Sequence, residues 1–155
     1  EIGSMSIASL HLTPNSEDLR HPEIDLIVNS QKNYENRILM GDMNSMSKYD
    51  NYSPRIVEDF NDMLIRKFTT NGNLRFDAID KIISSGYYDS AQHLDRNNES
   101  TVPTGMNQDT AHIRSRLDYI FTSKSLLPRL VNYSVIKTDL TNRASDHYPV
   151  VVTLK

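Results

Sequence analysis

The chain has 155 residues, of which 37% are hydrophobic and 24% charged, and this composition favours one folded domain over a disordered or membrane-embedded protein. Its 17 basic and 20 acidic side chains give a net charge of −3, which argues against retention on nucleic acid by bulk charge but not against a local cationic groove. The absence of cysteine excludes disulfides, thiolate metal sites and a cysteine nucleophile.

The first half of the chain alternates predicted strands and helices. Residues 6–12 mix small and apolar side chains before a proline, which indicates a strand. The apolar positions of residues 19–28 follow helical spacing, and either Ser16 or Pro22 can open that helix. Residues 37–44 begin as a buried strand and end in polar residues, so this strand delivers side chains from its C-terminal end.

Two further helices and a long polar segment follow. A Ser-Pro pair opens a single predicted helix whose apolar stripe runs over residues 56–68. A second helix carries the apolar residues 78–83 and stops at Gly86, the residue type expected just after a helix. Residues 95–114 are polar and lack periodicity, and a loop of this length is usually functional or mobile.

The last part of the chain contains three predicted strands, at residues 117–121, 131–138 and 148–154. The apolar run 150–152 has no polar face, so we expect that strand to be central or sandwiched. No apolar run reaches the roughly 20 residues that cross a bilayer. The first four residues lack the features of a secretory signal, which favours a cytoplasmic protein. The mixture of elements predicts one α/β layered domain over residues 1–155.

Asp42 and Asn44 stand at the end of a predicted strand, within the run Gly-Asp-Met-Asn. Such a run is often only a turn, because Asp and Asn bond to nearby backbone groups and tolerate left-handed geometry. The functional interpretation is that a carboxylate and an amide, two residues apart on one strand face, point at a shared anion or hydrated metal.

Asp118 and His147 form a second candidate pair. Asp118 shares a strand face with Ile120, and a carboxylate in an apolar strand is costly unless it is paired. One interpretation is a salt bridge to Arg116. The other is a hydrogen bond from His147, which stands just before an apolar strand; this bond would fix the histidine tautomer and raise its basicity for acid–base work or charge stabilisation at a phosphate.

Together these motifs resemble the endonuclease/exonuclease/phosphatase superfamily, which includes deoxyribonuclease I, abasic-site endonucleases, neutral sphingomyelinases and inositol polyphosphate phosphatases. The motifs that carry the resemblance are, in order, Ser9-Leu10-His11-Leu12, Gly41-Asp42-Met43-Asn44, Gly86-Tyr87-Tyr88-Asp89, Arg116-Leu117-Asp118-Tyr119-Ile120 and Ser145-Asp146-His147-Tyr148-Pro149-Val150. They span nearly the whole chain.

The resemblance implies a fold and a gap in it. Members have a deoxyribonuclease I-like, four-layer α/β/β/α sandwich, and they carry an N-terminal asparagine and a metal-binding glutamate that nothing before His11 supplies. The chain therefore resembles the C-terminal part of such a domain, apparently lacking much of the N-terminal half. We expect the inner sheet face, including Ile38, Met40, Val150 and Val152, to be uncovered. Pairing with a second copy or with the missing segment, and little activity of the chain alone, would follow.

The resemblance also implies residue roles. His147, oriented by Asp118, would activate water or stabilise developing charge at the scissile phosphate. Asp42 would position or deprotonate the water, and His11 would be a second phosphate ligand or an acid for the leaving oxygen; which histidine is acid and which is base stays open. Asp146 would bind the metal, and the hard oxygen ligands favour Mg²⁺ or Mn²⁺. The residues expected to bind substrate are Asn44, Arg116 and Arg143.

The function that these residues predict is a metal-dependent phosphoesterase acting on a phosphate-ester substrate. Nucleic acid, lipid headgroups, inositol phosphates and small phosphodiesters are all compatible with the shared core. The alternative is a non-catalytic interaction domain that keeps the fold without the metal.

Overall fold

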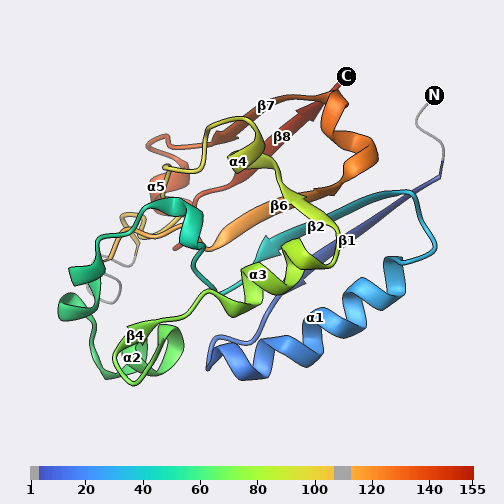
Figure 1. Cartoon of the computed structure of the whole chain (residues 1–155). Helices are drawn as coiled ribbons and strands as arrows, with labels where there is room; N and C mark the ends of the chain where they lie inside the picture. The colour runs from blue at the N-terminus through green and yellow to red at the C-terminus, as the bar shows by residue number, and fades with distance from the viewer. Residues whose placement is uncertain (1–3, 107–112) are drawn as a thin grey trace.

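The computed structural model describes residues 4–106 and 113–155 (Figure 1). In chain order its helices and strands are β1 (Met5–His11), α1 (Glu17–Gln31), β2 (Asn36–Asp42), α2 (Asp62–Phe68), β3 (Thr69–Thr70), β4 (Asn73–Leu74), α3 (Asp77–Ser84), β5 (Tyr87–Asp89), α4 (Ser90–His93), β6 (Asp118–Ser123), β7 (Leu130–Val135), α5 (Thr141–Ala144) and β8 (Val150–Leu154). Short 3₁₀-helices occupy Lys48–Asp50, Pro54–Asp59 and Lys124–Arg129. The α/β class predicted from the sequence is confirmed.

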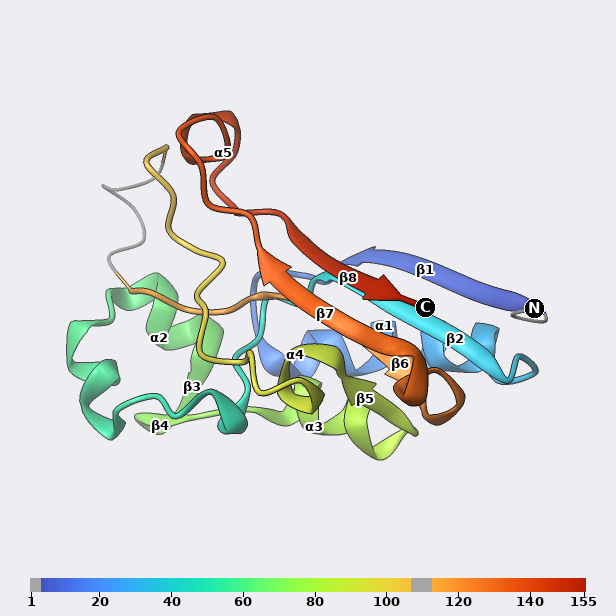
Figure 2. The same cartoon turned by 90° about the horizontal axis from the view of Figure 1, so that it is seen from above.

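The central sheet has the strand order β1-β2-β6-β5. β1 and β2 are parallel, whereas β2 with β6 and β6 with β5 are antiparallel. Helices α1 and α3 cover one face of this sheet, and the antiparallel β7–β8 ribbon lies over the other (Figures 1 and 2). The described chain is thus built of three layers: helices, sheet and ribbon.

Alternating side chains of the central strands build two separate cores. Leu39 and Phe121 are register partners that pack with helix residues such as Ile79. Their sequence neighbours Ile38 and Ile120 point to the opposite face, where they pack with β8. This alternation follows from the two-residue period of a strand and fixes which face each polar residue at the strand ends will meet.

The single helix expected over 53–68 is wrong. The segment forms a 3₁₀-helix at Pro54–Asp59 and then α2, because the backbone is extended at Phe60 and Asn61. Asn61 starts a new helix, since its side chain accepts a hydrogen bond from the Leu64 amide at 3.0 Å. The apolar stripe nevertheless builds a core, which includes Phe60, Leu64 and Phe68.

The expectation that β8 is central or sandwiched is also wrong, because among the described strands β8 pairs with β7 alone, and Val151 is 43% exposed. The inner sheet face is not left bare either: Ile38 is buried, and Met40, Val150 and Val152 pack partly buried beside it. The ribbon therefore covers the face that the sequence interpretation left open. These residues give no support for pairing with a second copy.

The other predicted elements lie close to their expected positions. The α3 helix is followed by Gly86 with a φ of +85°, the left-handed geometry that glycine tolerates best. The predicted loop 95–114 is irregular where it is described and is tied by a bridge between Val102 and Ser115; residues 107–112 lie outside the described part. Within the described ranges, no helix has the length and apolar character needed to cross a bilayer.

Candidate active site

Three neighbouring strands present polar residues in one row. His11 of β1 is the register partner of Asp42 of β2, and Asp42 is the register partner of Asp118 of β6. Register partners point to the same face, and Asp42 shares the parity of Ile38 and Met40. The row therefore lies on the ribbon side, at the edge of the sheet where β1 and β2 end and β6 begins.

Local backbone geometry aims this row. Gly41 has a φ of +129°, and a Cβ atom there would lie 2.0 Å from the carbonyl oxygen of Leu10, so only glycine fits between β1 and Asp42. Asn44 has a φ of +49°, and its backbone N–H donates to Asp42 Oδ1 at 2.7 Å. Gly-Asp-Met-Asn therefore forms the expected turn, which also places the Asp42 carboxylate at the strand end; its role toward a ligand stays a prediction.

His147 meets the row from the loop that precedes β8. Its Nδ1 lies 2.8 Å from Asp118 Oδ2, and its Nε2 lies 3.9 Å from Asp42 Oδ2. Because a carboxylate only accepts, Nδ1 carries the proton and Nε2 faces the cavity. Burial alone would lower the pKa of His147, but the hydrogen bond and charge of Asp118 outweigh it and raise that pKa. The predicted hydrogen bond between His147 and Asp118 is confirmed.

His11 and Asp146 lie at the margin of the site. His11 Nε2 is 3.4 Å from Asp42 Oδ2, and its side chain is 73% exposed, so it can meet a ligand from solvent. Asp146 is exposed beside His147, and its charge is one of those that raise the pKa of His147. The structure thus brings together the candidates from all three motifs.

These residues line a cavity of about 590 Å³. One part of its wall is polar, and it consists of His11, Asp42, Asn44, Lys67, Ser115, Asp118, Asp146 and His147. The other part is apolar, and it consists of Pro14, Met63, Leu64, Phe68, Val102, Ile113 and Leu117. Such a surface suits a molecule with a charged group and an adjoining apolar group.

Asp42 carries the signature of a group that lacks a full counter-charge. Burial and the neighbouring Asp118 carboxylate raise the pKa of Asp42, although the hydrogen bond from the Asn44 backbone N–H lowers it. Asp42, Asp118 and His147 each offer a ligand atom, and these atoms lie within 4.8 Å of one another. A carboxylate pair with surplus negative charge fits a hard divalent cation.

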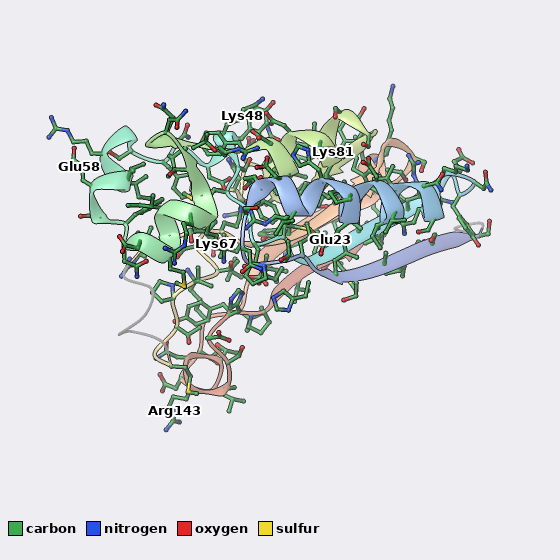
Figure 3. The ribbon with its side chains drawn as sticks, turned by 90° about the horizontal axis from the view of Figure 1, so that it is seen from below. Glu23, Lys48, Glu58, Lys67, Lys81 and Arg143 are labelled. Carbon is green, nitrogen blue, oxygen red and sulfur yellow. The ribbon has the colours of Figure 1, made fainter. Side chains whose placement is uncertain are left out.

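Two predicted substrate-binding residues do not line the cavity. Arg116 is wrong as a substrate ligand, because its side chain is 1% exposed and its guanidinium binds Asp50 and Asp89 at 2.7 and 2.6 Å. Its place in the Asp118 motif does not predict its contacts, because the Arg116 side chain is buried between two aspartates whereas Asp118 lines the cavity. Arg143 is exposed on α5, which projects away from the sheet (Figure 3), and its role stays a prediction.

Sequence reasoning missed Lys67. This residue lies in the last turn of α2, a position where basic residues commonly complement the helix dipole, so its type and place carried no functional signal. In the structure Lys67 lines the cavity and donates a hydrogen bond to the side-chain oxygen of Asn44. Burial lowers the pKa of Lys67 to about 8. Only the fold of α2 over the end of β2 reveals the contact.

Comparisons with known proteins rest on structure, because the sequence matches no family model and no curated protein. A 3′ phosphatase, NExo from Neisseria bound to product DNA hairpin, matches 96% of this chain and 60% of its own, with 17% identity and a TM-score of 0.71. An AP endonuclease from Archaeoglobus fulgidus matches 98% and 62%, with 17% identity and a TM-score of 0.69.

A third solved structure carries the superfamily name itself. It is an endonuclease/exonuclease/phosphatase family protein from Leptotrichia buccalis, which is 24% identical over 96% of this chain and 49% of its own, with a TM-score of 0.56. This chain thus spans about half to three-fifths of the length of the structures it matches. It shares their deoxyribonuclease I-like fold, over part of the length of each.

Proposed function

We propose that this chain carries the phosphate-ester site of a metal-dependent phosphoesterase, which hydrolyses phosphodiester or phosphomonoester bonds. The observation that carries the proposal is the convergence of His11, Asp42, Asp118 and His147, from four separate segments, on one cavity. A histidine paired with one carboxylate and facing a second is suited to moving a proton at a bound phosphate.

In this proposal each side chain acts through the atom it presents. Asp118 holds the Nδ1 proton of His147, so that Nε2 faces the phosphate and either activates water or stabilises the charge that develops. Asp42, whose pKa is raised by burial, positions or deprotonates the water. His11, open to solvent, reaches a phosphoryl oxygen or the leaving oxygen.

Mg²⁺ or Mn²⁺ is the cofactor that we propose. Asp146 would supply one of its oxygen ligands, and the carboxylates of Asp42 and Asp118 add to the negative charge that attracts it. When bound, the cation polarises a phosphoryl oxygen and offsets the charge of the reacting group. Without a cation the polar wall carries an excess of negative charge, since it holds three aspartates and one lysine.

Nucleic acid is the substrate class that we favour. The solved structures of similar fold include a 3′ phosphatase bound to DNA and an AP endonuclease. The apolar wall beside the polar one suits a sugar or base attached to the phosphate. A net charge of −3 fits a protein that grips one phosphate locally rather than a long stretch of backbone.

The test compares substrates and variants on the purified chain. A 3′-phosphorylated oligonucleotide, an abasic-site duplex, an inositol polyphosphate and bis(p-nitrophenyl) phosphate are incubated with Mg²⁺ or with EDTA. Because the chain spans only part of the domain it matches, we expect little hydrolysis, but what there is should depend on Mg²⁺, be fastest on a nucleic acid and be lost in His147→Asn. His93→Asn, which changes an exposed histidine on α4, is the matched control and keeps activity.

Other outcomes separate the alternatives. Calorimetry that shows no Mg²⁺ or Mn²⁺ binding, even with phosphate present, would indicate the non-catalytic interaction domain that keeps the fold without the metal. Absence of both binding and hydrolysis would overturn the proposal. Faster hydrolysis of the inositol polyphosphate than of either oligonucleotide would keep the phosphoesterase but reject nucleic acid as its substrate.

A further inference from the structure

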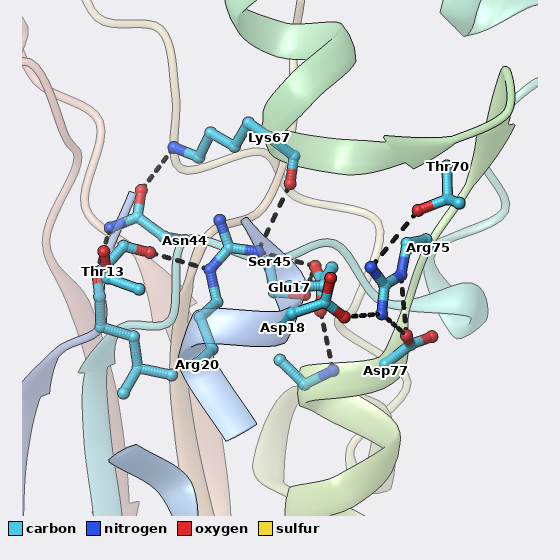
Figure 4. A network of polar contacts seen from close by, with 12 residues as sticks. Thr13, Glu17, Asp18, Arg20, Asn44, Ser45, Lys67, Thr70, Arg75 and Asp77 are labelled. Atoms are coloured by element: carbon cyan, nitrogen blue, oxygen red, sulfur yellow. Dashed lines mark hydrogen bonds and ion pairs between the residues drawn. The ribbon is translucent and has the colours of Figure 1, made fainter. Parts of the chain in front are cut away.

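Lys67 is a cavity residue that the superfamily motifs do not contain. It belongs to the last turn of α2 and lines the cavity, and its side chain points toward Asn44, which follows β2 (Figure 4). Its ammonium group contacts Asn44 and lies 5.0 Å from the centroid of the Phe68 ring. Lys67 is half-buried, and these two contacts hold its ammonium group in place.

The Lys67 contact fixes the orientation of the Asn44 amide. Asn44 is 3% exposed, and its Nδ2 donates to the carbonyl oxygen of Leu12 at 2.7 Å, while its Oδ1 accepts from Lys67. A carbonyl only accepts and an ammonium only donates, so the amide fits in one orientation. One Nδ2 proton remains beyond the bond to Leu12.

A buried ion pair contacts the backbone of Lys67 (Figure 4). Arg20 and Glu17 of α1 bind each other at 2.8 Å with both side chains fully buried. Arg20 also donates to the carbonyl oxygens of Thr13, at 2.9 Å, and of Lys67, at 3.5 Å. The loop after β1 and the end of α2 are thereby tied to one guanidinium, which holds Lys67 in place relative to the sheet.

Charge gives Lys67 its function in the cavity. Among the described residues that line the cavity, it is the only lysine or arginine, against the carboxylates of Asp42, Asp118 and Asp146. A phosphate ester that approaches these carboxylates meets repulsion unless a cation faces it. An ammonium held at a fixed position is suited to a phosphoryl oxygen, and it keeps this position before the ligand arrives.

We propose that Lys67 is a phosphate-binding residue of this site, which donates to a non-bridging oxygen of the substrate and holds Asn44 in its substrate-facing orientation. This inference rests on the proposed phosphoesterase function, because it assigns a residue to the same cavity. It adds a binding group from α2, an element outside every motif by which the sequence predicts the site.

The experiment uses Lys67→Met, Lys67→Arg and the control Arg66→Met on the full chain. Met keeps the apolar stem without the charge, and Arg66 is an exposed basic residue one position earlier in the same helix. Steady-state kinetics are measured on the preferred oligonucleotide, and inorganic phosphate binding is measured by calorimetry. The side-chain amide signal of Asn44 is followed by NMR in the absence of ligand.

We expect Lys67→Met to raise KM and the phosphate Kd by about tenfold or more, since a charge-assisted hydrogen bond is lost. It should also lower kcat and shift the Asn44 amide signal. Lys67→Arg should restore most of the affinity but little of kcat, because a guanidinium keeps the charge without the same reach. Arg66→Met should match the wild type.

One result overturns this assignment alone, and another overturns it together with the proposed function. If the wild type hydrolyses or binds phosphate and Lys67→Met does so with unchanged KM, kcat and Kd, then Lys67 is not a ligand and the phosphoesterase stands. If the wild type neither hydrolyses nor binds phosphate, the proposed function fails, and Lys67 with it. Thermal unfolding of each variant confirms that it is folded.

Discussion

Two clusters of carboxylates lie near the start of β6, and they differ in whether an arginine neutralises their charge. In the first, Arg116 donates from Nε and one terminal nitrogen to Asp50, at 3.2 and 2.7 Å, and from both terminal nitrogens to Asp89, at 3.0 and 2.6 Å. The three side chains are almost fully buried. Two residues along the chain, Asp118 begins the second cluster.

In the second cluster the carboxylates lack such a partner. Asp118 and Asp42 both face His147, and Asp42 Oδ2 also lies 3.4 Å from Nε2 of the exposed His11. The side chains of Asp42, Asp118 and His147 keep some exposure to the cavity. The pKa of Asp42 is raised by burial and by Asp118. Burial raises the pKa of Asp50 in the first cluster as well. There, however, both carboxylates bind the Arg116 guanidinium, whereas the second cluster leaves charge available to a ligand, and this difference separates a structural ion network from a binding site.

The largest effect should come from breaking the closed cluster. Arg116→Met leaves Asp50 and Asp89 buried without a counter-ion, and we expect a loss of about 3–5 kcal/mol in the free energy of unfolding. Urea denaturation measures this change. Lys48→Met, which breaks a half-exposed pair with Asp80, is the control and should cost about 0.5 kcal/mol or less. Equal midpoints for the two variants would show that the Arg116 network carries no stability.

Next in size is the effect of uncharging the open cluster. Asp118→Asn keeps the shape of the side chain but removes the charge that raises the pKa of His147. We expect kcat/KM to fall about 100-fold, as for loss of an oriented general base, while the free energy of unfolding changes by about 1 kcal/mol or less. An NMR titration should show a lower His147 pKa, and an unmoved value would contradict this pairing.

The same substitution should have opposite signs in the two clusters. Asp42→Asn removes an under-neutralised charge and keeps the oxygen that accepts from the Asn44 amide, so stability at pH 7 should rise by about 0.5–2 kcal/mol. Asp50→Asn removes a partner of Arg116 and should lower stability by about 1–3 kcal/mol. Urea midpoints decide the signs, and a destabilised Asp42→Asn would place its charge among the structural ones.

The smallest effect is a dependence of stability on pH. The folded-state pKa of His147 lies above its unfolded value, so its contribution to stability is complete below about pH 6.5 and is lost as the pH rises through the folded pKa. The stability difference between wild type and His147→Asn should therefore shrink between pH 6 and 9. Unfolding measured across this range gives the slope, and His93→Asn should follow the wild-type curve.

Motifs predicted the open cluster, because its members sit at strand ends. The endings of β1 and β2 and the pairing of β6 follow from strand periodicity, so the amino-acid pattern is enough to place His11, Asp42 and Asp118 on one edge. The same reasoning assigned Arg116 to substrate. Its true partners come from a 3₁₀-helix and from β5, and no local pattern reports that convergence.

The wrong predictions about the fold have local and non-local causes. The break near Asn61 was readable, since this residue type caps helices, but the continuous apolar stripe concealed it. The place of β8 was not readable, because an apolar run of valines fits a central strand as well as a ribbon over another sheet. Lys67 belongs to the same class: its contact with Asn44 depends on how α2 folds back.

The β7–β8 ribbon brings His147 to a sheet that already holds Asp42 and Asp118. The His147–Asp118 bond therefore joins two layers and forms only where the ribbon is seated on the sheet. The cavity and the packing of the ribbon on the sheet share this one contact, so the Nδ1 proton of His147 reports whether the ribbon is packed on the sheet. Its protection from exchange with solvent would report, at a single atom, how often the two layers separate.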